Sequence, residues 1–242
     1  MPGSIGAASP SRFLEIGAVG EELYVIERRI HGVALADKLG DLAGPRRELA
    51  LHSHLAAARA ICRLAPPQAE FGELLTDGQP LTRATWRDYL RDSAAQAVAR
   101  LRPTLIIDVP GIDRALPGFA AMVEDLPEPE PRLVHGDYHP GNTLVDADGR
   151  LVGVIDFGPL TLSGDPLLDV VCAISFLGYA RDCRPADKAL LRQLAGDDPG
   201  LAAGLAVYDA YYAFRFADMK LDGPEVYAWS VATLRALGEG SR

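Results

Sequence analysis

Two short segments combine residue types that could transfer a phosphoryl group. Residues 135–142 read His-Gly-Asp-Tyr-His-Pro-Gly-Asn, and residues 155–158 read Ile-Asp-Phe-Gly. Asp156 follows Asp137 by 19 positions, beyond a predicted hairpin. One carboxylate can orient an attacking hydroxyl, while an amide oxygen and a second carboxylate are ligands that Mg²⁺ accepts. The pattern predicts phosphoryl transfer, with Asp137 as the catalytic residue and Asn142 and Asp156 as metal ligands.

A structural reading of the same residues is that they only form turns. Asp, Pro, Gly and Asn are all common in turns, so this reading explains any one of them. It does not explain a second carboxylate in Asp-Phe-Gly beyond a hairpin. The spacing therefore favours a shared site, in which Pro140 and Gly141 turn the chain sharply enough to bring Asp137 and Asn142 together.

Four further polar residues near these segments are expected to support the backbone. We expect His135 to brace backbone carbonyls, and we leave open whether His139 touches substrate or phosphate. Asp165 is expected to be the N-cap of the helix that follows, with Pro166 at the first helical position. Asp169 lies one turn into that run, so its carboxylate must be paired or must cap other groups.

The elements that position these residues follow from hydrophobic periodicity. Strands are predicted at 13–16 and 23–27, joined by a turn at Gly20 to Glu22, and at 143–145 and 151–157. Helices are predicted at 45–64, at 85–101 with Pro103 closing the segment, around 119–126, and at 186–195, 200–219 and 224–237. The run after Pro166 is apolar nearly all round, which predicts a buried central helix. Residues 1–11 are expected to be loose.

The composition excludes several classes of partner. The chain has 242 residues and a net charge of −9, which argues against nucleic acid as a partner. No apolar run is long enough to span a membrane, and no secretory signal precedes the first strand. Three scattered cysteines fit a reducing cytoplasm. Oligomeric state is left open.

The acidic balance could favour an amine-bearing acceptor. Six carboxylates in the C-terminal half could form an acidic wall: Asp182, Asp197, Asp198, Asp209, Asp218 and Asp222. The alternative is that they are solvated surface groups that keep the protein soluble.

The motif set resembles the aminoglycoside phosphotransferase and choline kinase group of small-molecule kinases. Three segments carry the resemblance: HGDYHPGN, VIDFG and GDPLLDV. Residues 24–32 are also similar to the hinge strand of that family, where backbone groups meet the adenine. The resemblance implies an α+β, protein-kinase-like fold, with ATP and Mg²⁺ as cofactors and a small-molecule hydroxyl as acceptor. It implies nucleotide contacts at Ile26, Glu27 and Arg28.

The resemblance further implies a β-rich lobe before the hinge, carrying a lysine that pairs with the phosphates. Here about 23 residues precede the hinge strand, and they hold no lysine. We therefore expect a truncated remnant of that lobe with its hinge at 1–31, and a helical lobe with the catalytic loop and metal-binding hairpin at 32–242. Three explanations stay open: a shortened kinase, an inactive relative, or a second chain that supplies the missing wall. The alternative function is a catalytically impaired binding module without a complete ATP site.

Overall fold

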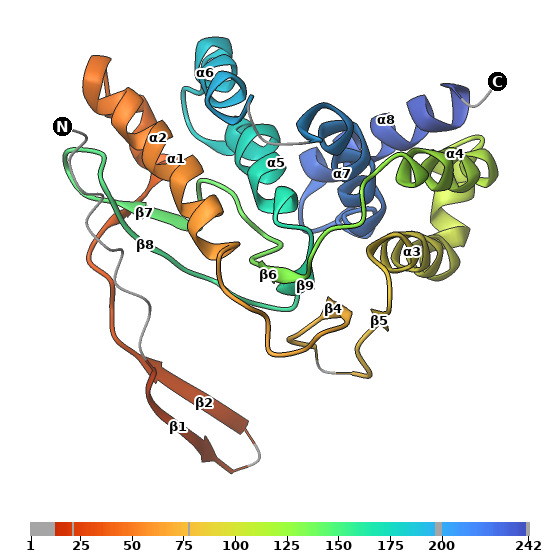
Figure 1. The fold of residues 1–242 in the computed structure, drawn as a ribbon, viewed down its shortest axis with the longest axis horizontal. Coiled ribbons are helices and arrows are strands. Elements are labelled where there is room, and N and C mark those ends of the chain that lie inside the picture. Colours follow the sequence, from red (N-terminus) through yellow and green to blue (C-terminus); the bar gives the residue numbers. More distant parts are fainter. Residues whose placement is uncertain (1–12, 21, 77, 197–199, 241–242) are drawn as a thin grey trace.

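The computed structural model describes residues 13–20, 22–76, 78–196 and 200–240. Helices make up most of the body, and small sheets lie along one side of them (Figure 1). The helices are α1 (Leu35–Lys38), α2 (Gly44–Ile61), α3 (Trp86–Asp108), α4 (Ile112–Glu124), α5 (Leu167–Ser175), α6 (Pro185–Ala195), α7 (Leu201–Arg215) and α8 (Pro224–Gly240), with 3₁₀ turns η1 (Leu39–Asp41) and η2 (Phe176–Tyr179).

The strands of the described residues form three antiparallel sheets. They are β1 (Phe13–Val19), β2 (Glu22–Glu27), β3 (Val33–Ala34), β4 (Phe71–Glu73), β5 (Thr82–Arg83), β6 (Arg132–Val134), β7 (Thr143–Val145), β8 (Leu151–Val154) and β9 (Leu162–Gly164). Their orders are β1-β2, β3-β7-β8 and β5-β4-β9-β6. The predicted α+β class, with a mostly helical main body, is confirmed.

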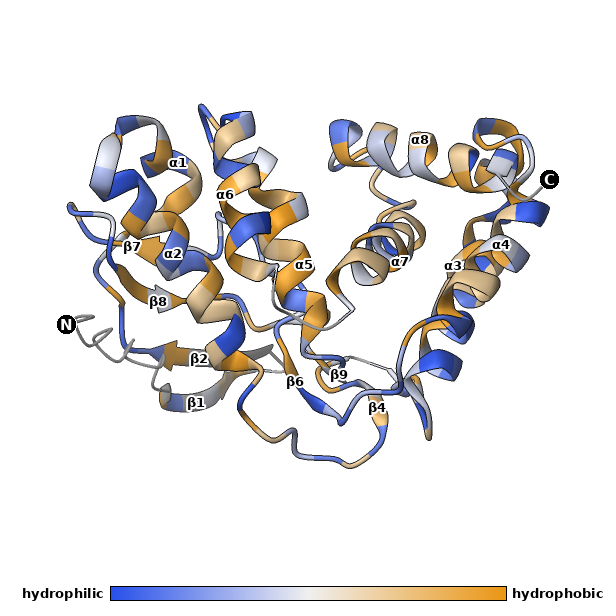
Figure 2. Ribbon diagram, turned by 45° about the horizontal axis from the view of Figure 1, so that its top comes forward, coloured by the Kyte–Doolittle hydropathy of each residue, from blue (hydrophilic) through white to orange (hydrophobic). Residues whose placement is uncertain are grey.

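Helix α5 forms the centre of the core. Every residue from Leu167 to Ile174 is buried, and the helix packs against α2, α6 and α7. Figure 2 shows α5 almost entirely in the hydrophobic colours. A helix that is apolar on all faces is stable in water only when other elements cover each face. The burial of this helix confirms the central helix that the sequence predicts.

The β1-β2 hairpin is a sheet of its own. It extends away from the helical body at the lower left of Figure 1. Gly20 adopts a φ of +67° in the turn, a conformation that glycine reaches without steric cost. Both predicted strands are present. Residues 1–11 and Glu21, to which expectations were also attached, lie outside the described residues.

Several predicted boundaries are wrong, including the start of the helix expected around 119–126, which begins at Ile112. Helix α3 continues past Pro103 to Asp108, because Leu105 and Val109 beyond the proline are fully buried and their burial offsets the lost hydrogen bond. Strand β8 ends at Val154 rather than at residue 157, because the chain turns into a left-handed conformation at Asp156. Helix α7 ends at Arg215, and turns follow it. The short strands β4, β5 and β9 were not foreseen.

Candidate active site

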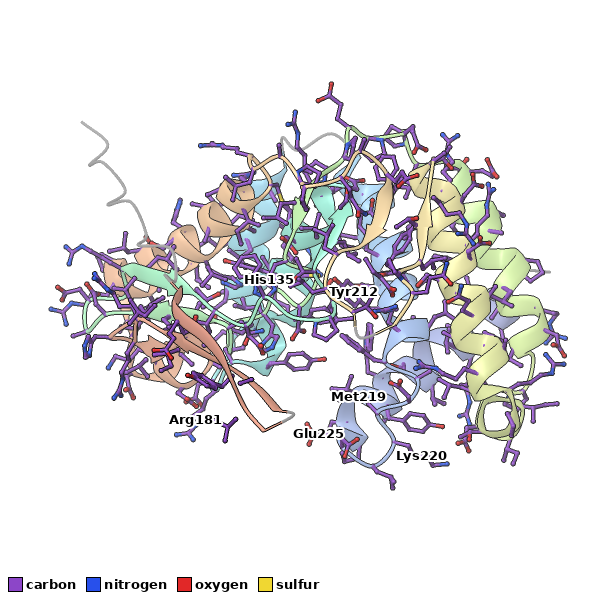
Figure 3. All side chains as sticks on the ribbon, turned by 90° about the horizontal axis from the view of Figure 1, so that it is seen from below. His135, Arg181, Tyr212, Met219, Lys220 and Glu225 are labelled. Atoms are coloured by element: carbon purple, nitrogen blue, oxygen red, sulfur yellow. The ribbon has the colours of Figure 1, made fainter. Side chains whose placement is uncertain are left out.

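The loop between β6 and β7 carries the first motif, and buried groups hold its backbone. The carboxylate of Asp169 in α5 accepts the N–H groups of His135 (2.8 Å) and Gly136 (3.0 Å). The Tyr212 hydroxyl in α7 donates to the Gly136 carbonyl at 2.6 Å. Figure 3 shows His135 and Tyr212 side by side at the centre of the molecule. The loop is therefore fixed from two helices at once.

The surroundings of position 136 leave room for glycine alone. Its φ is +77°, and a Cβ at this position would lie 1.7 Å from the Leu160 carbonyl oxygen. Only glycine allows the two segments to approach so closely. This approach brings residues 158–161 against the start of the loop, where the Thr161 hydroxyl donates to the His135 carbonyl at 3.3 Å.

His135 links the first motif to the second. Its Nδ1 accepts the Asp137 N–H at 3.2 Å, so the proton of the neutral ring lies on Nε2, which donates to the Ile155 carbonyl at 2.8 Å. The ring is fully buried and packs on Phe157, with centroids 4.5 Å apart. His135 therefore braces the backbone as expected, and it positions the residue that precedes Asp156.

Asp137 and Asn142 lie together. The Asn142 amide donates to the Asp137 carbonyl at 2.9 Å and to the Asp137 carboxylate at 3.3 Å. Asn142 is buried, whereas the Asp137 side chain is about one-third (32%) exposed. The carboxylate thus faces accessible space, while its backbone is held in the protein interior.

Asp156 is adjacent to this pair. The Ile155 N–H donates to the Asn142 carbonyl at 3.0 Å, and Thr143 pairs with Val154 across the β7-β8 hairpin. Asp156 has a φ of +67°, and its exposed side chain makes no hydrogen bond or ion pair with any described residue. The left-handed backbone turns the chain out of the strand and leaves this carboxylate free.

The donor set fits a hard divalent cation. The Asn142 amide nitrogen is engaged with Asp137, so its oxygen remains as a possible ligand, and Asp156 adds an unpaired carboxylate. No group of three or more His, Cys, Asp or Glu side chains suited to a metal occurs among the described residues. The protein would supply few ligands, as is usual for Mg²⁺ bound mainly through phosphates and water.

His139 lies between the two carboxylates and an aromatic side chain. Its Nε2 is 3.8 Å from the Asp137 carboxylate, its Nδ1 accepts the Gly141 N–H at 3.0 Å, and Tyr179 meets it edge-on. Burial lowers the pKa of His139, and the nearby Asp137 and Asp156 carboxylates only partly oppose this. The ring is therefore neutral at neutral pH. Whether it touches a ligand stays open.

The segment that is predicted to contact the nucleotide lies at the end of β2. Ile26 and Glu27 end β2, Arg28 follows them, and all three are exposed. No hydrogen bond or ion pair among the described residues joins them to the catalytic loop. The residues that follow Arg28 approach the β7-β8 hairpin, since Ile30 packs closely against Gly153 in β8. The structure thus anchors the segment after β2 beside the β7-β8 hairpin.

The predicted acidic wall is dispersed as far as the described residues show. Asp218 pairs with Arg100 at 2.9 Å, while Asp209 lines a cavity of about 380 Å³ beside Tyr179 and Trp229. Asp182 lies next to Gly40, near α1. Asp197 and Asp198 lie outside the described residues.

Two supporting residues were missed or only half foreseen. Nothing in the sequence singled out Tyr212, because a tyrosine in an apolar helix has the pattern of an ordinary core residue. Asp169 was expected to cap or pair with something, but its partners on the loop could not be named. The Asp165 carboxylate does cap the first turn of α5, since it accepts the Leu167 N–H at 2.8 Å, but the helix begins at Leu167, so Pro166 and not Asp165 holds the N-cap position.

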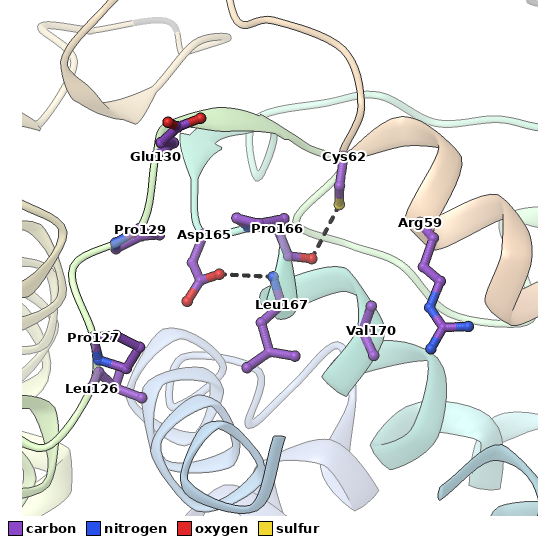
Figure 4. Close-up of a pocket in the computed structure, with 10 residues that line it drawn as sticks. All are labelled: Arg59, Cys62, Leu126, Pro127, Pro129, Glu130, Asp165, Pro166, Leu167 and Val170. Carbon is purple, nitrogen blue, oxygen red and sulfur yellow. Dashed lines mark hydrogen bonds between the residues drawn. The ribbon is translucent and has the colours of Figure 1, made fainter. Parts of the chain in front are cut away.

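A second cavity, of about 400 Å³, lies at the start of α5. Cys62, Leu126, Pro166 and Val170 are among the side chains around it (Figure 4). None of the predicted site residues lines it. Within the part of the chain that the structure describes, no helix has the length and apolar character needed to cross a membrane.

Known structures share this architecture. A crystal structure of aminoglycoside phosphotransferase APH(4)-Ia has 28% identity and a TM-score of 0.69, covering 96% of this chain and 77% of that chain. A thermostable mutant of the same enzyme, in a ternary complex with AMP-PNP and hygromycin B, has 26% identity and a TM-score of 0.69 over 96% of this chain and 77% of that chain. Macrolide 2'-phosphotransferase type I shares the fold at 20% identity and a TM-score of 0.53, covering 91% and 71% of the two chains.

A search of curated proteins found no match. The sequence model of the phosphotransferase enzyme family matches residues 2–214. This range contains both motifs and the helix that holds the catalytic loop. The chain therefore belongs to the phosphotransferase enzyme family, whose structurally similar members act on small molecules.

Proposed function

We propose that this protein transfers the γ-phosphoryl group of ATP to a hydroxyl group of a small molecule in a Mg²⁺-dependent reaction. The observation that carries the proposal is the adjacency of Asp137, Asn142 and Asp156, with the Asp156 carboxylate and the Asn142 amide oxygen unengaged. The AMP-PNP complex of the similar enzyme supports nucleotide use.

Asp137 is the proposed catalytic residue. Its carboxylate accepts a hydrogen bond from the acceptor hydroxyl and aims the oxygen lone pair at the phosphorus. Phosphoryl transfer has a loose transition state, so positioning contributes more than strong base catalysis. The Asn142 amide, 3.3 Å from the Asp137 carboxylate, restricts the rotation of that side chain.

Asn142 and Asp156 are the proposed Mg²⁺ ligands. When bound, the ion neutralises developing charge on the phosphate oxygens. His135 keeps the two ligands in register, because it joins the loop to the Ile155 carbonyl. We further propose that the backbone of Ile26, Glu27 and Arg28 receives the adenine, which rests on the sequence resemblance of this segment to a hinge strand.

The proposed division of the chain is a hinge and N-lobe segment at 1–31 and a helical lobe at 32–242. It is supported by the β1-β2 hairpin, whose strands pair only with each other among the described residues. The proposed location is the cytoplasm, where ATP is available. Cys62, Cys172 and Cys183 form no disulfide bond in the structure, which agrees with a reducing compartment.

The acceptor is proposed to be a small molecule. Similar structures contain hygromycin B or gentamicin, so a cationic acceptor is one candidate class. Asp209 and Trp229 line one cavity near Tyr179, and an aromatic ring beside a carboxylate suits an amine.

One observation favours the alternative, a binding module without efficient transfer. All three lysines are engaged away from the loop. Lys38 pairs with Asp41, Lys188 donates to the Ser175 carbonyl, and Lys220 pairs with Asp108. No lysine is therefore positioned to contact the phosphates.

Thermal shift with Mg·ATP separates the two functions. The proposal predicts a Mg²⁺-dependent rise in Tm that Asp156→Asn abolishes, since Asn keeps the left-handed backbone but removes the charge. Asp137→Asn should retain the shift and lose turnover. Asp148→Asn, in an exposed turn, is the control. Absence of any shift in the unsubstituted chain would contradict nucleotide binding and favour the binding module.

A further inference from the structure

A cavity of about 310 Å³ between α3, α7 and β4 has an unusual set of lining groups. Glu73, Ser93, Gln96, Arg100 and Arg215 contribute its polar atoms. Its volume is at the lower end of the range for small-molecule pockets. Because Ser93 and Gln96 lie on α3 while Arg215 ends α7, three separate parts of the chain converge on it.

The cavity is close to the catalytic loop. Tyr212 donates to the Gly136 carbonyl, and Arg215 follows three residues later, roughly 4.5 Å further along the axis of α7. In Figure 3, Tyr212 lies beside His135, and Met219 and Lys220 mark where the chain leads away after α7. Arg215, the last residue of α7, therefore lies about one helical turn beyond the residue that holds the loop.

Both oxygens of the one carboxylate that lines the cavity are already used. One oxygen of the Glu73 carboxylate accepts Arg215 Nη1 at 3.1 Å, and the other accepts the Leu81 N–H at 3.1 Å. Glu73 is held by the protein itself and has little capacity left to receive a donor from a ligand.

The donor atoms are in surplus. Arg215 is mostly buried and makes one hydrogen bond to the described residues, although a guanidinium carries five N–H donors. The Ser93 hydroxyl is buried at 3% exposure and has no partner among them. Gln96 also makes no hydrogen bond to these residues. A buried hydroxyl without a partner is costly, so a ligand that supplies an acceptor here would stabilise the site.

The charged groups at the cavity offset one another in pairs. Glu73 offsets Arg215, and Asp218 offsets Arg100 at 2.9 Å. The remaining attraction comes from unused N–H and O–H donors rather than from a large positive charge. A carboxylate adds one negative charge beside Glu73, whereas a phosphate monoester adds about two, and a carboxylate also matches the planar fork of an arginine.

We propose that this cavity binds a carboxylate group carried by the acceptor, so that the acceptor is a hydroxy acid. That this ligand is the phosphoryl acceptor rests on the function proposed above. The binding site itself does not depend on that function, and it is tested without nucleotide or Mg²⁺.

The test is an NMR titration of the full chain that follows the Arg215 Nε–Hε signal. The probes are acetate, inorganic phosphate, choline, and the pair glycerate and glycerol, which differ by the carboxylate. Acetate is expected to shift the signal saturably, and glycerate to bind at least about tenfold more tightly than glycerol, as for one charge-assisted hydrogen bond.

Variants locate the binding. Ser93→Ala removes a hydroxyl that has no partner among the described residues, so it should not unfold the protein, and it should weaken acetate binding by about fivefold. Arg100→Gln should also weaken it. Arg102→Gln is the matched control, since Arg102 lies on the same helix and pairs with Asp113 at 2.9 Å, outside the cavity.

Four results would overturn the proposal. These are no saturable shift with acetate or glycerate, tighter binding of phosphate than of acetate, a shift caused by choline, and an equal loss of affinity in Arg102→Gln and Arg100→Gln. The Mg·ATP thermal shift reports on nucleotide binding alone. A chain that binds Mg·ATP but not acetate therefore refutes the hydroxy-acid acceptor and leaves the proposed function intact.

Discussion

The carboxylate of Asp169 accepts the backbone N–H of His135 at 2.8 Å and thereby ties the core helix α5 to the catalytic loop. Asp169 is fully buried, and its second oxygen accepts the Gly136 N–H. Burial raises the pKa of this carboxyl, with the His135 ring and the two N–H groups opposing the rise. The loop conformation thus depends on a side chain that no substrate reaches.

Asp169→Ala should destabilise the protein and disorder the loop. It leaves two buried N–H groups without partners, at a cost of about 2–5 kcal/mol in the free energy of unfolding. Urea denaturation measures this cost, and Asp113→Asn in an exposed ion pair is the control. An unchanged denaturation midpoint would show that the loop conformation does not depend on the hydrogen bonds to Asp169.

Gly136→Ala should prevent the native loop from forming. The added Cβ meets the Leu160 carbonyl at 1.7 Å, and the φ of +77° disfavours any L side chain. We expect loss of a cooperative thermal transition or a fall in Tm of many degrees. Gly78→Ala is the matched control, because a Cβ added there would have no neighbour within 4 Å and the φ is not positive. Equal Tm values for the two variants would contradict the close approach.

Arg47→Met should cost about 3–5 kcal/mol, because it leaves a buried carboxylate unpaired. Arg47 binds both oxygens of Asp187, at 2.8 and 2.6 Å, and also the Leu39 carbonyl. The neighbouring Arg46→Met is the control, since the one ion pair of Arg46 with a described residue is an exposed pair with Asp148.

The same pair predicts a pH dependence. The Arg47 hydrogen bond lowers the pKa of Asp187 below 3.8. A carboxyl whose pKa is lower in the folded protein than in the unfolded chain stabilises the fold at pH values above its unfolded-state pKa. This stabilisation is lost as the pH falls through its folded-state pKa. The difference in unfolding free energy between the unsubstituted protein and Arg47→Met should therefore narrow below about pH 4. A difference that is constant with pH would show that the pair contributes through packing alone.

Asp209→Asn should stabilise the protein at neutral pH. Burial raises the pKa of Asp209, and one of its oxygens has no partner among the described residues, although Ser175, Lys188 and Arg192 favour the charged form. Because the pKa of Asp209 is higher in the folded protein than in the unfolded chain, the folded protein loses stability as the pH rises through the folded-state pKa of Asp209.

The increase in the free energy of unfolding caused by Asp209→Asn should thus be present at pH 7 and shrink as the pH falls towards the ordinary pKa of an Asp side chain. Thermal denaturation over this range measures it, with Asp222→Asn as an exposed control. A gain that is independent of pH would contradict the titration of Asp209.

The sequence located the parts of the site that follow local rules. Asp137, Asn142 and Asp156 were chosen from spacing across a hairpin, and the structure places them side by side. Their roles remain proposals. The buried helix at 167–174 followed from its continuous apolar character, and the cap at Asp165 from its place before Pro166.

The features that were missed depend on contacts between distant segments. Tyr212 reaches Gly136 across 76 positions, and no local pattern encodes that pairing. The continuation of α3 past Pro103 depends on burial of Leu105, which outweighs the local propensity. Strands β4 and β9 are three residues each, too short to show an alternating pattern. The β1-β2 hairpin was expected as two strands of a truncated lobe, and no third strand of the described residues pairs with it.

The left-handed backbone at Asp156 also limits how this position can change during evolution. Asn and Gly tolerate the same geometry, whereas branched or bulky residues do not. A single replacement to Asn or Gly would remove the anionic ligand and leave the surrounding chain undisturbed. A substitution at this position can therefore remove catalytic activity without unfolding the protein. A descendant of this protein could lose catalysis in this way and remain a stable protein that binds its former substrate.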